Sequence, residues 1–120
     1  MQKMIVKKPW GTYEVLLDEP NYKVKRIVVH PYERFSLQYH KHREEHLVVV
    51  EGDGIVQVNE KEYPAYVRTH WVILPTQKHR ATAGPNGLVF IETQTGNCYE
   101  EDIVRLEDDY GRLDSSEVSV

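Results

Sequence analysis

The chain has 120 residues, of which 40% are hydrophobic and 28% are charged, and this size and composition predict one domain with a single modest core. The net charge of -4, without a basic block, argues against nucleic acid and anionic membranes as partners. No apolar run reaches the about 20 residues that cross a bilayer, and the single cysteine, Cys98, excludes an internal disulfide. We therefore expect a cytoplasmic protein without a membrane segment.

Short strand patterns dominate the chain from residue 22 onward. The expected strands span residues 22–30, 34–40, 46–50, 55–58, 70–74, 79–83 and 88–95. The segments with turn signals between them are 51–54, 59–61 and 84–87. Seven or so strands at intervals of roughly 8 to 12 residues indicate an all-β sandwich or barrel. Residues 100–111 fit either a helical turn or an extended arm, and residues 113–120 are expected to be a frayed tail.

Side chains that bind metals are concentrated on and after the second expected strand. If Leu37 and Tyr39 face one side of that strand, then Gln38 and His40 face the other. Polar groups inside a small barrel destabilise it unless a partner satisfies them, and a metal ion is a suitable partner. The spacing Gln38-x-His40, four residues, then Glu45 places three such groups on two neighbouring strands.

A fourth ligand can come from His79, which begins a later strand after Pro75. Two imidazoles, a carboxylate and an amide oxygen suit one divalent ion, and the sequence leaves Zn, Mn, Co, Ni and Fe open. A second register would use His40 and His42 as the pair, but only two residues then precede Glu45. In the first register, His42 and His46 lie next to the centre or face the substrate. The two histidines expected to have no role in the site, and to be either surface or satisfied core residues, are His30 and His70.

The ligand spacing resembles the first two sequence motifs of the cupin superfamily, in which a small antiparallel barrel holds one metal. Four blocks extend the resemblance to the type II mannose-6-phosphate isomerase domain: PWGTYEVL (9–16), YKVKRI (22–27), QYHKHREEH (38–46) and EDIVRLEDDYGR (101–112). In many bacteria that domain is the C-terminal part of a bifunctional protein with mannose-1-phosphate guanylyltransferase. The resemblance implies a single cupin barrel over residues 1–112, a double-stranded β-helix or jelly roll, followed by a flexible tail at 113–120.

The chain departs from the family pattern in three places. It has no guanylyltransferase domain and no Gly-rich nucleotide loop, so no nucleotidyl transfer is expected. Tyr32 stands where the family has glycine in a P-G-E turn. The segment PTQKH (75–79) is one residue shorter than the family's P-x-G-x-x-H and lacks its glycine. Because this loop positions His79, the change bears most on the fourth ligand.

The resemblance implies that mannose 6-phosphate and fructose 6-phosphate are interconverted through an enediolate. A metal ion would polarise the sugar carbonyl, and a base would move a proton between C1 and C2. The candidate bases are Lys25, His46 and Glu92.

The substrate phosphate calls for an arginine, whose planar fork binds phosphate oxygens in pairs. Arg43 lies between the expected ligands and Arg80 adjoins His79, but the family resemblance favours Arg112 as the active-site arginine. Further candidates for substrate contact are His42 and Gln94. The aromatic residues expected to pack in the protein rather than stack on a sugar are Trp10, Tyr13 and Trp71.

Three functions compete. The favoured one is a stand-alone sugar-phosphate isomerase in GDP-mannose or polysaccharide biosynthesis. The alternatives are a cupin that binds a sugar or sugar phosphate without turnover, and a metal-cupin enzyme acting on a different substrate. Because a second copy can cover open sheet edges, and because the family commonly pairs, a homodimer is expected.

Overall fold

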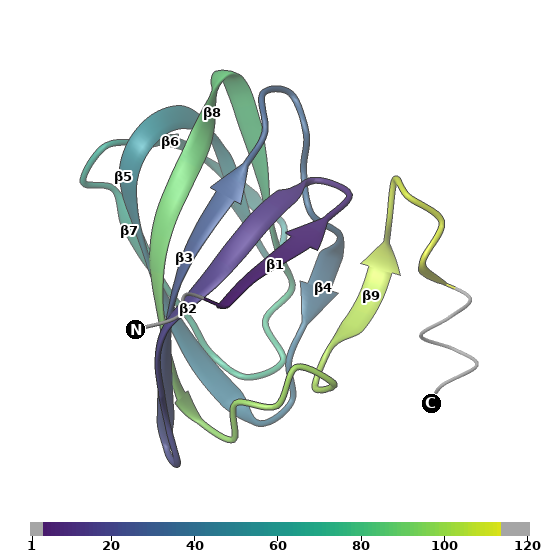
Figure 1. Ribbon diagram of the computed structural model, residues 1–120. Helices are drawn as coiled ribbons and strands as arrows, with labels where there is room; N and C mark the ends of the chain where they lie inside the picture. The colour runs from purple at the N-terminus through teal and green to yellow at the C-terminus, as the bar shows by residue number, and fades with distance from the viewer. Residues whose placement is uncertain (1–3, 114–120) are drawn as a thin grey trace.

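The computed structural model describes residues 4–113, which form nine β-strands (Figure 1). The strands are β1 (Met4–Lys8), β2 (Gly11–Glu19), β3 (Tyr22–Val29), β4 (Leu37–Tyr39), β5 (Arg43–Val58), β6 (Lys61–Tyr66), β7 (His70–Ile73), β8 (His79–Gly96) and β9 (Val104–Glu107). This architecture confirms the all-β prediction. Over the same residues, no helix has the length and apolar character needed to cross a membrane. Apart from Leu113, the predicted tail lies outside the described residues.

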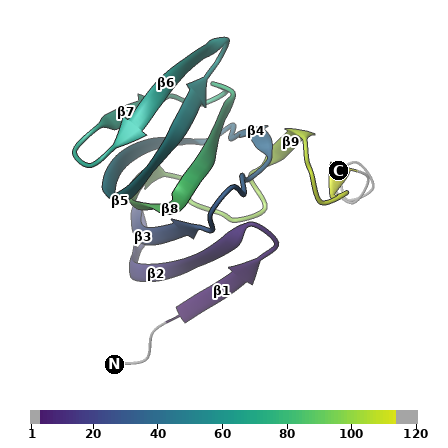
Figure 2. The ribbon, with the colours of Figure 1, turned by 90° about the horizontal axis from the view of Figure 1, so that it is seen from above.

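One antiparallel sheet curls into an open barrel. Its strand order is β1-β2-β3-β8-β4-β9, and β5 joins it by pairing with β6, β7 and β8. Seen from above, β5, β6 and β7 lie toward one side and β1, β2 and β3 toward the other (Figure 2). Both views show β4 and β9 next to each other at one flank. The flank matters because β4 leads into one predicted metal ligand and β9 brings the C-terminal block to it.

Two predicted turns are instead bends within long strands. The structure runs β5 through 51–54 and β8 through 84–87, with bulges in the ladder between them. Gly52 and Gly87 adopt φ values of 82° and 75°, and a Cβ added to Gly52 would lie 2.0 Å from the carbonyl oxygen of Gly87. These glycines signal a turn in the sequence, but here they let two strands bend and approach closely.

Other differences from the predicted elements occur at the edges of the sheet. No strand was predicted at β1, β2 or β6, because residues there are partly exposed on both faces and show no clear alternation. The predicted strand 34–40 shortens to β4, with an isolated bridge between Arg34 and Thr82. Residues 104–107 form β9, so the extended alternative for the C-terminal block is correct.

The hydrophobic core fills the barrel between the curled strands. Val29 and Phe90 are fully buried in it, and the ring of Trp10 meets that of Phe35 edge-on at 5.6 Å between centroids. The predicted packing role of Trp10 is thereby confirmed. Two further aromatic residues pack against this core while staying partly exposed: Tyr13 and Trp71.

Candidate functional site

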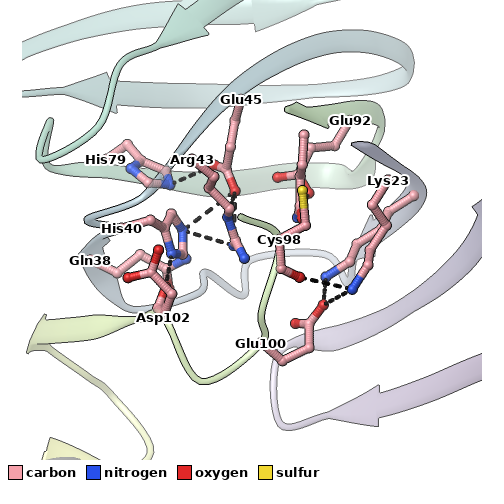
Figure 3. Close-up of polar contacts among 12 residues, drawn as sticks. Lys23, Gln38, His40, Arg43, Glu45, His79, Glu92, Cys98, Glu100 and Asp102 are labelled. Carbon is pink, nitrogen blue, oxygen red and sulfur yellow. Dashed lines mark hydrogen bonds and ion pairs between the residues drawn. The ribbon is translucent and has the colours of Figure 1, made fainter. Parts of the chain in front are cut away.

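Three metal-ligating side chains meet inside the barrel. His40 follows β4, Glu45 lies on β5 and His79 begins β8, and each offers a ligand atom within 4.8 Å of the other two (Figure 3). Nε2 of His40 lies 3.4 Å from Oε2 of Glu45, and Nε2 of His79 lies 3.1 Å from Oε1. All three residues are buried. The structure therefore brings together three of the four predicted ligands as one compact group able to hold a metal ion.

Backbone carbonyls hold both imidazoles in the orientation of metal ligands. Nδ1 of His40 donates to the carbonyl of Asp102 at 2.5 Å, and Nδ1 of His79 donates to that of Gln77 at 3.0 Å. Since Nδ1 carries the proton in each ring, a neutral ring keeps its lone pair on Nε2. Both Nε2 atoms point to the carboxylate of Glu45, which is how outer hydrogen bonds orient histidines around a metal.

A divalent cation fits this group of atoms. Oε1 of Glu45 is buried and has no hydrogen-bond partner, although Nε2 of His79 lies only 3.1 Å from it. The lone pairs of Nε2 of His79 and Oε1 of Glu45 face each other away from water, so a cation or a proton is needed between them. The fourth predicted ligand, Gln38, lies alongside with its amide nitrogen 3.4 Å from Nε2 of His40. Its oxygen accepts a hydrogen bond from Ser36, so ligation through that oxygen requires the amide to turn over.

Arg43 lies against Glu45 and offsets its negative charge. Its Nε donates to Oε2 of Glu45 at 2.9 Å, its Nη1 to the carbonyl of Tyr99 at 3.1 Å, and its Nη2 lies 3.1 Å from Nε2 of His40. Burial alone would raise the pKa of Glu45, but His79, His40 and Arg43 outweigh it and hold that pKa well below its usual range. Burial lowers the pKa of His40 to about 4. Burial also opposes the charged form of His79, but Glu45 outweighs it and raises the pKa of that ring.

The shortened loop 75–79 still delivers His79 to the centre. Thr76 takes the left-handed conformation, with φ of 71°, in this loop that lacks the family's glycine. Its amide donates to the carbonyl of His40 at 2.7 Å, while Oε1 of Gln77 accepts from the amide of Leu74 at 2.8 Å. Tyr32, which stands where the family has glycine, likewise has a positive φ, of 64°. Each turn thus holds a non-glycine residue in the left-handed region, which strains the backbone.

A pocket opens beside the metal-ligand group, and two more predicted residues, Lys25 and Glu92, line it. They are neighbours across the β3–β8 ladder, and both are buried. Burial raises the pKa of Glu92 to about 7, and the charge of Glu45 acts in the same direction. Nζ of Lys25 lies 2.5 Å from Oε2 of Glu100 and 4.1 Å from the centroid of the Tyr13 ring. The floor is part of the hydrophobic core: Trp10, Ile27, Phe35, Leu47 and Phe90.

Another part of the pocket wall is cationic. The predicted Arg112 lines it and makes a two-point contact with Asp108, from Nε and Nη2 at 2.9 Å each. Lys8 and Arg105 line it as well. Sequence reasoning missed both residues, although Arg105 lies inside the block 101–112. The family block 101–112 marked Arg105 as a residue of interest. Its place at the pocket follows from the pairing of β9 with β4, which the sequence does not reveal.

Two predicted residues lie outside the pocket. His46 is exposed on the outer face of β5, with its ring 5.9 Å from that of His70, because alternation sends Glu45 inward and its neighbour outward. This placement corrects the expectation that His46 reaches the substrate as a base. His42 is also exposed, and its amide donates to the carboxylate of Asp102 at 2.9 Å. Of the two alternatives left open for His30 and His70, surface or satisfied core, the structure shows the surface one, since both are exposed.

Two other candidates are buried without lining the pocket. Nε2 of Gln94 donates to Oε1 of Glu92 at 2.6 Å, so this amide lies behind the carboxylate and does not face the cavity. The guanidinium of Arg80 donates to the carbonyl of Phe35 at 2.9 Å and contacts Oε1 of Glu107 at 3.1 Å. These contacts connect β8 to the segments around β4 and β9, so Arg80 stabilises the fold.

Comparison with known proteins agrees with the sequence resemblance. The family model for the mannose-6-phosphate isomerase C-terminal domain matches residues 1–108. A mannose-1-phosphate guanylyltransferase of Klebsiella pneumoniae is 36% identical over 108 residues, covering 88% of this chain and 23% of that protein. The alginate biosynthesis protein AlgA of Pseudomonas aeruginosa is 40% identical over 109 residues, covering 89% of this chain and 23% of that protein. The chain thus spans about a quarter of the length of these curated relatives.

Solved structures share the fold. The capsular polysaccharide assembling protein CapF of Staphylococcus aureus superposes with a TM-score of 0.78 at 17% identity, over 88% of this chain and 34% of that one. The cupin domain of Schizosaccharomyces pombe Cnp3 gives a TM-score of 0.67 at 12% identity, over 72% of this chain and 64% of that one. With a family match that covers most of its length, this chain belongs to the mannose-6-phosphate isomerase C-terminal domain family and has the cupin fold.

Proposed function

We propose that this chain is a metal-dependent aldose–ketose isomerase that interconverts mannose 6-phosphate and fructose 6-phosphate. The observation that carries the proposal is the buried group of His40, Glu45 and His79 beside a pocket that also contains Glu92. The family match supports the substrate, and the names of the relatives support a setting in GDP-mannose and polysaccharide biosynthesis.

The isomerisation needs an electrophile at the carbonyl group. His40, Glu45 and His79, together with Gln38, would hold one divalent cation, which supplies Lewis-acid chemistry when bound. Arg43 lines the same pocket and donates to Oε2 of Glu45, so it would remain next to the carboxylate that would help to hold the cation. As a guanidinium that lines the pocket, Arg43 would be available to donate to a sugar oxygen.

The reaction also needs a base that moves one proton between neighbouring carbons. Glu92 suits this role, because a pKa of about 7 lets the carboxylate take the proton from C2 and return it to C1 near neutral pH. Gln94 holds Glu92 from behind. Lys25 lines the pocket and is paired with Glu100, and its ammonium group would stabilise negative charge developing on the sugar oxygens.

The test is a coupled assay of fructose 6-phosphate formation from mannose 6-phosphate. Protein stripped with EDTA is assayed before and after Zn, Mn, Co, Ni or Fe(II) is added singly. We expect one or more ions to restore turnover in the wild type and none to restore it in His40→Ala, while the exposed-site control His30→Ala keeps its activity. Glu92→Gln should retain metal but lose activity by a factor of about 100 or more.

One result would refute the isomerase. If stoichiometric metal is bound and no ion gives turnover, the chain is a cupin that binds a sugar phosphate without converting it, or an enzyme for another sugar. A binding measurement with mannose 6-phosphate then separates these two alternatives.

A further inference from the structure

Lys8 and Arg105 come from opposite ends of the described chain and line one pocket. Lys8 ends β1 and Arg105 lies on β9, yet both line the same pocket with Arg112. Burial and the charges of Arg105 and Arg112 together lower the pKa of Lys8, because three cations share one partly buried wall. Like charges repel, so such a wall destabilises the fold unless an anion faces it.

Glu100 lines the same pocket, but two of the three cations lack a direct ion-pair partner within the described residues. Asp108 neutralises Arg112, but within residues 4–113 no carboxylate forms an ion pair with Lys8 or with Arg105. Nε of Arg105 is buried and makes no hydrogen bond. A buried guanidinium donor without a partner is uncommon in a folded protein and points to a ligand that completes it.

The position of Arg105 relates this wall to the metal-ligand group. Arg105 is the cross-strand partner of Gln38 in the β4–β9 ladder, so both side chains leave the same face of the sheet. Lys8 approaches from the other side, with its Nζ 6.0 Å from the centroid of the Tyr13 ring. The pocket thus joins an acidic, metal-binding part around Glu45 to a cationic part around Arg105.

We propose that Lys8, Arg105 and Arg112 form an anion subsite that binds the phosphoryl group of a sugar phosphate whose carbonyl end lies at the metal-ligand group. The inference rests on the proposed function and adds to it a direction of binding and a requirement for a phosphorylated substrate. Arginine forks bind phosphate oxygens in pairs, and Lys8 adds a point charge. A free sugar offers no anion to Lys8 and Arg105, so the subsite selects phosphorylated sugars.

The experiment measures equilibrium binding and not turnover. Isothermal titration calorimetry at fixed ionic strength follows mannose 6-phosphate and inorganic phosphate binding to the wild type, Lys8→Gln, Arg105→Gln and Arg105→Lys. Lys7→Gln is the matched control, because this neighbouring lysine is exposed on the opposite face of β1. Metal content and thermal unfolding are recorded for every variant to show that the fold and the metal-ligand group remain intact.

We expect Lys8→Gln and Arg105→Gln to weaken mannose 6-phosphate binding about tenfold or more, because each removes a charged hydrogen-bond donor. Arg105→Lys should recover part of the affinity, and Lys7→Gln should match the wild type. The proposal is overturned if Lys8→Gln binds mannose 6-phosphate as the wild type does, or if the wild type binds neither phosphate ligand. Lys8→Gln decides the matter even if Arg105→Gln fails to fold.

Parallel turnover assays keep the two proposals separate. If Lys8→Gln and Arg105→Gln weaken mannose 6-phosphate binding but the wild type has no isomerase activity, the subsite is supported and the proposed function is refuted. Turnover with an unchanged KM in Lys8→Gln and Arg105→Gln would support the isomerase and refute the subsite.

Discussion

Replacing Arg43 by methionine is expected to destabilise the metal-free protein strongly. The substitution removes the cation that contacts Glu45 at 2.9 Å, where the two side chains are only 5% and 2% exposed, so water cannot compensate the carboxylate. Removing one partner of a buried ion pair costs about 3–5 kcal/mol. The hydrogen bond to the carbonyl of Tyr99 is lost as well. For a domain of this size the loss corresponds to a decrease in Tm of roughly 10–20 °C.

The assay is urea unfolding of EDTA-treated protein, repeated with a saturating divalent cation. A cation held by His40, Glu45 and His79 takes over the neutralisation of Glu45, so the deficit of Arg43→Met should shrink when metal is present. The control is Arg26→Met, whose guanidinium is 41% exposed and 3.8 Å from Glu51, and which should change stability by less than about 1 kcal/mol.

Two results would refute this reasoning. One is a loss below about 1 kcal/mol for metal-free Arg43→Met, which would mean that Glu45 does not depend on the guanidinium. The other is additivity with Glu45→Gln in a double-mutant cycle, since residues that share an ion pair should couple.

Four further predictions concern catalysis, the pH dependence of stability, the backbone and assembly. Because burial raises the pKa of Glu92 to about 7, kcat/KM should rise with pH up to about 7 in the wild type and not in Glu92→Gln; a flat wild-type profile would exclude Glu92 as the base. The same raised pKa adds stability that is complete below the ordinary carboxyl range and disappears as pH rises through about 7, so Glu92→Gln should gain stability relative to the wild type above that pH in urea titrations. Thr76→Gly should raise the free energy of unfolding by up to about 1 kcal/mol, since its φ of 71° strains a β-branched residue, whereas Thr76→Ser should not. A homodimer is expected, and a monomer by size-exclusion chromatography with light scattering at micromolar concentration would contradict it.

Local patterns in the sequence determined the fold class and most of the buried group that could hold a metal ion. The alternation that turns Gln38 and His40 away from Leu37, and the spacing to Glu45, are properties of neighbouring residues, so they survive folding. The same alternation excludes His46, because a residue next to an inward-facing one on a strand faces outward. The alternation in the sequence was therefore enough to exclude His46, which was considered only because imidazole can act as a base.

Tertiary structure alone decided the rest of the pocket. Gly52 and Gly87 could either end strands or bend them. The outcome depends on how closely β5 and β8 approach each other, and the sequence of one segment does not contain that distance. The pKa of Glu92 depends on burial and on the charge of Glu45, 47 positions earlier in the chain. Lys8 and Arg105 share a wall only because β1 and β9 sit on the two flanks of one curled sheet. Contacts between residues so distant in sequence follow from strand order and register, which are set by packing the whole barrel at once.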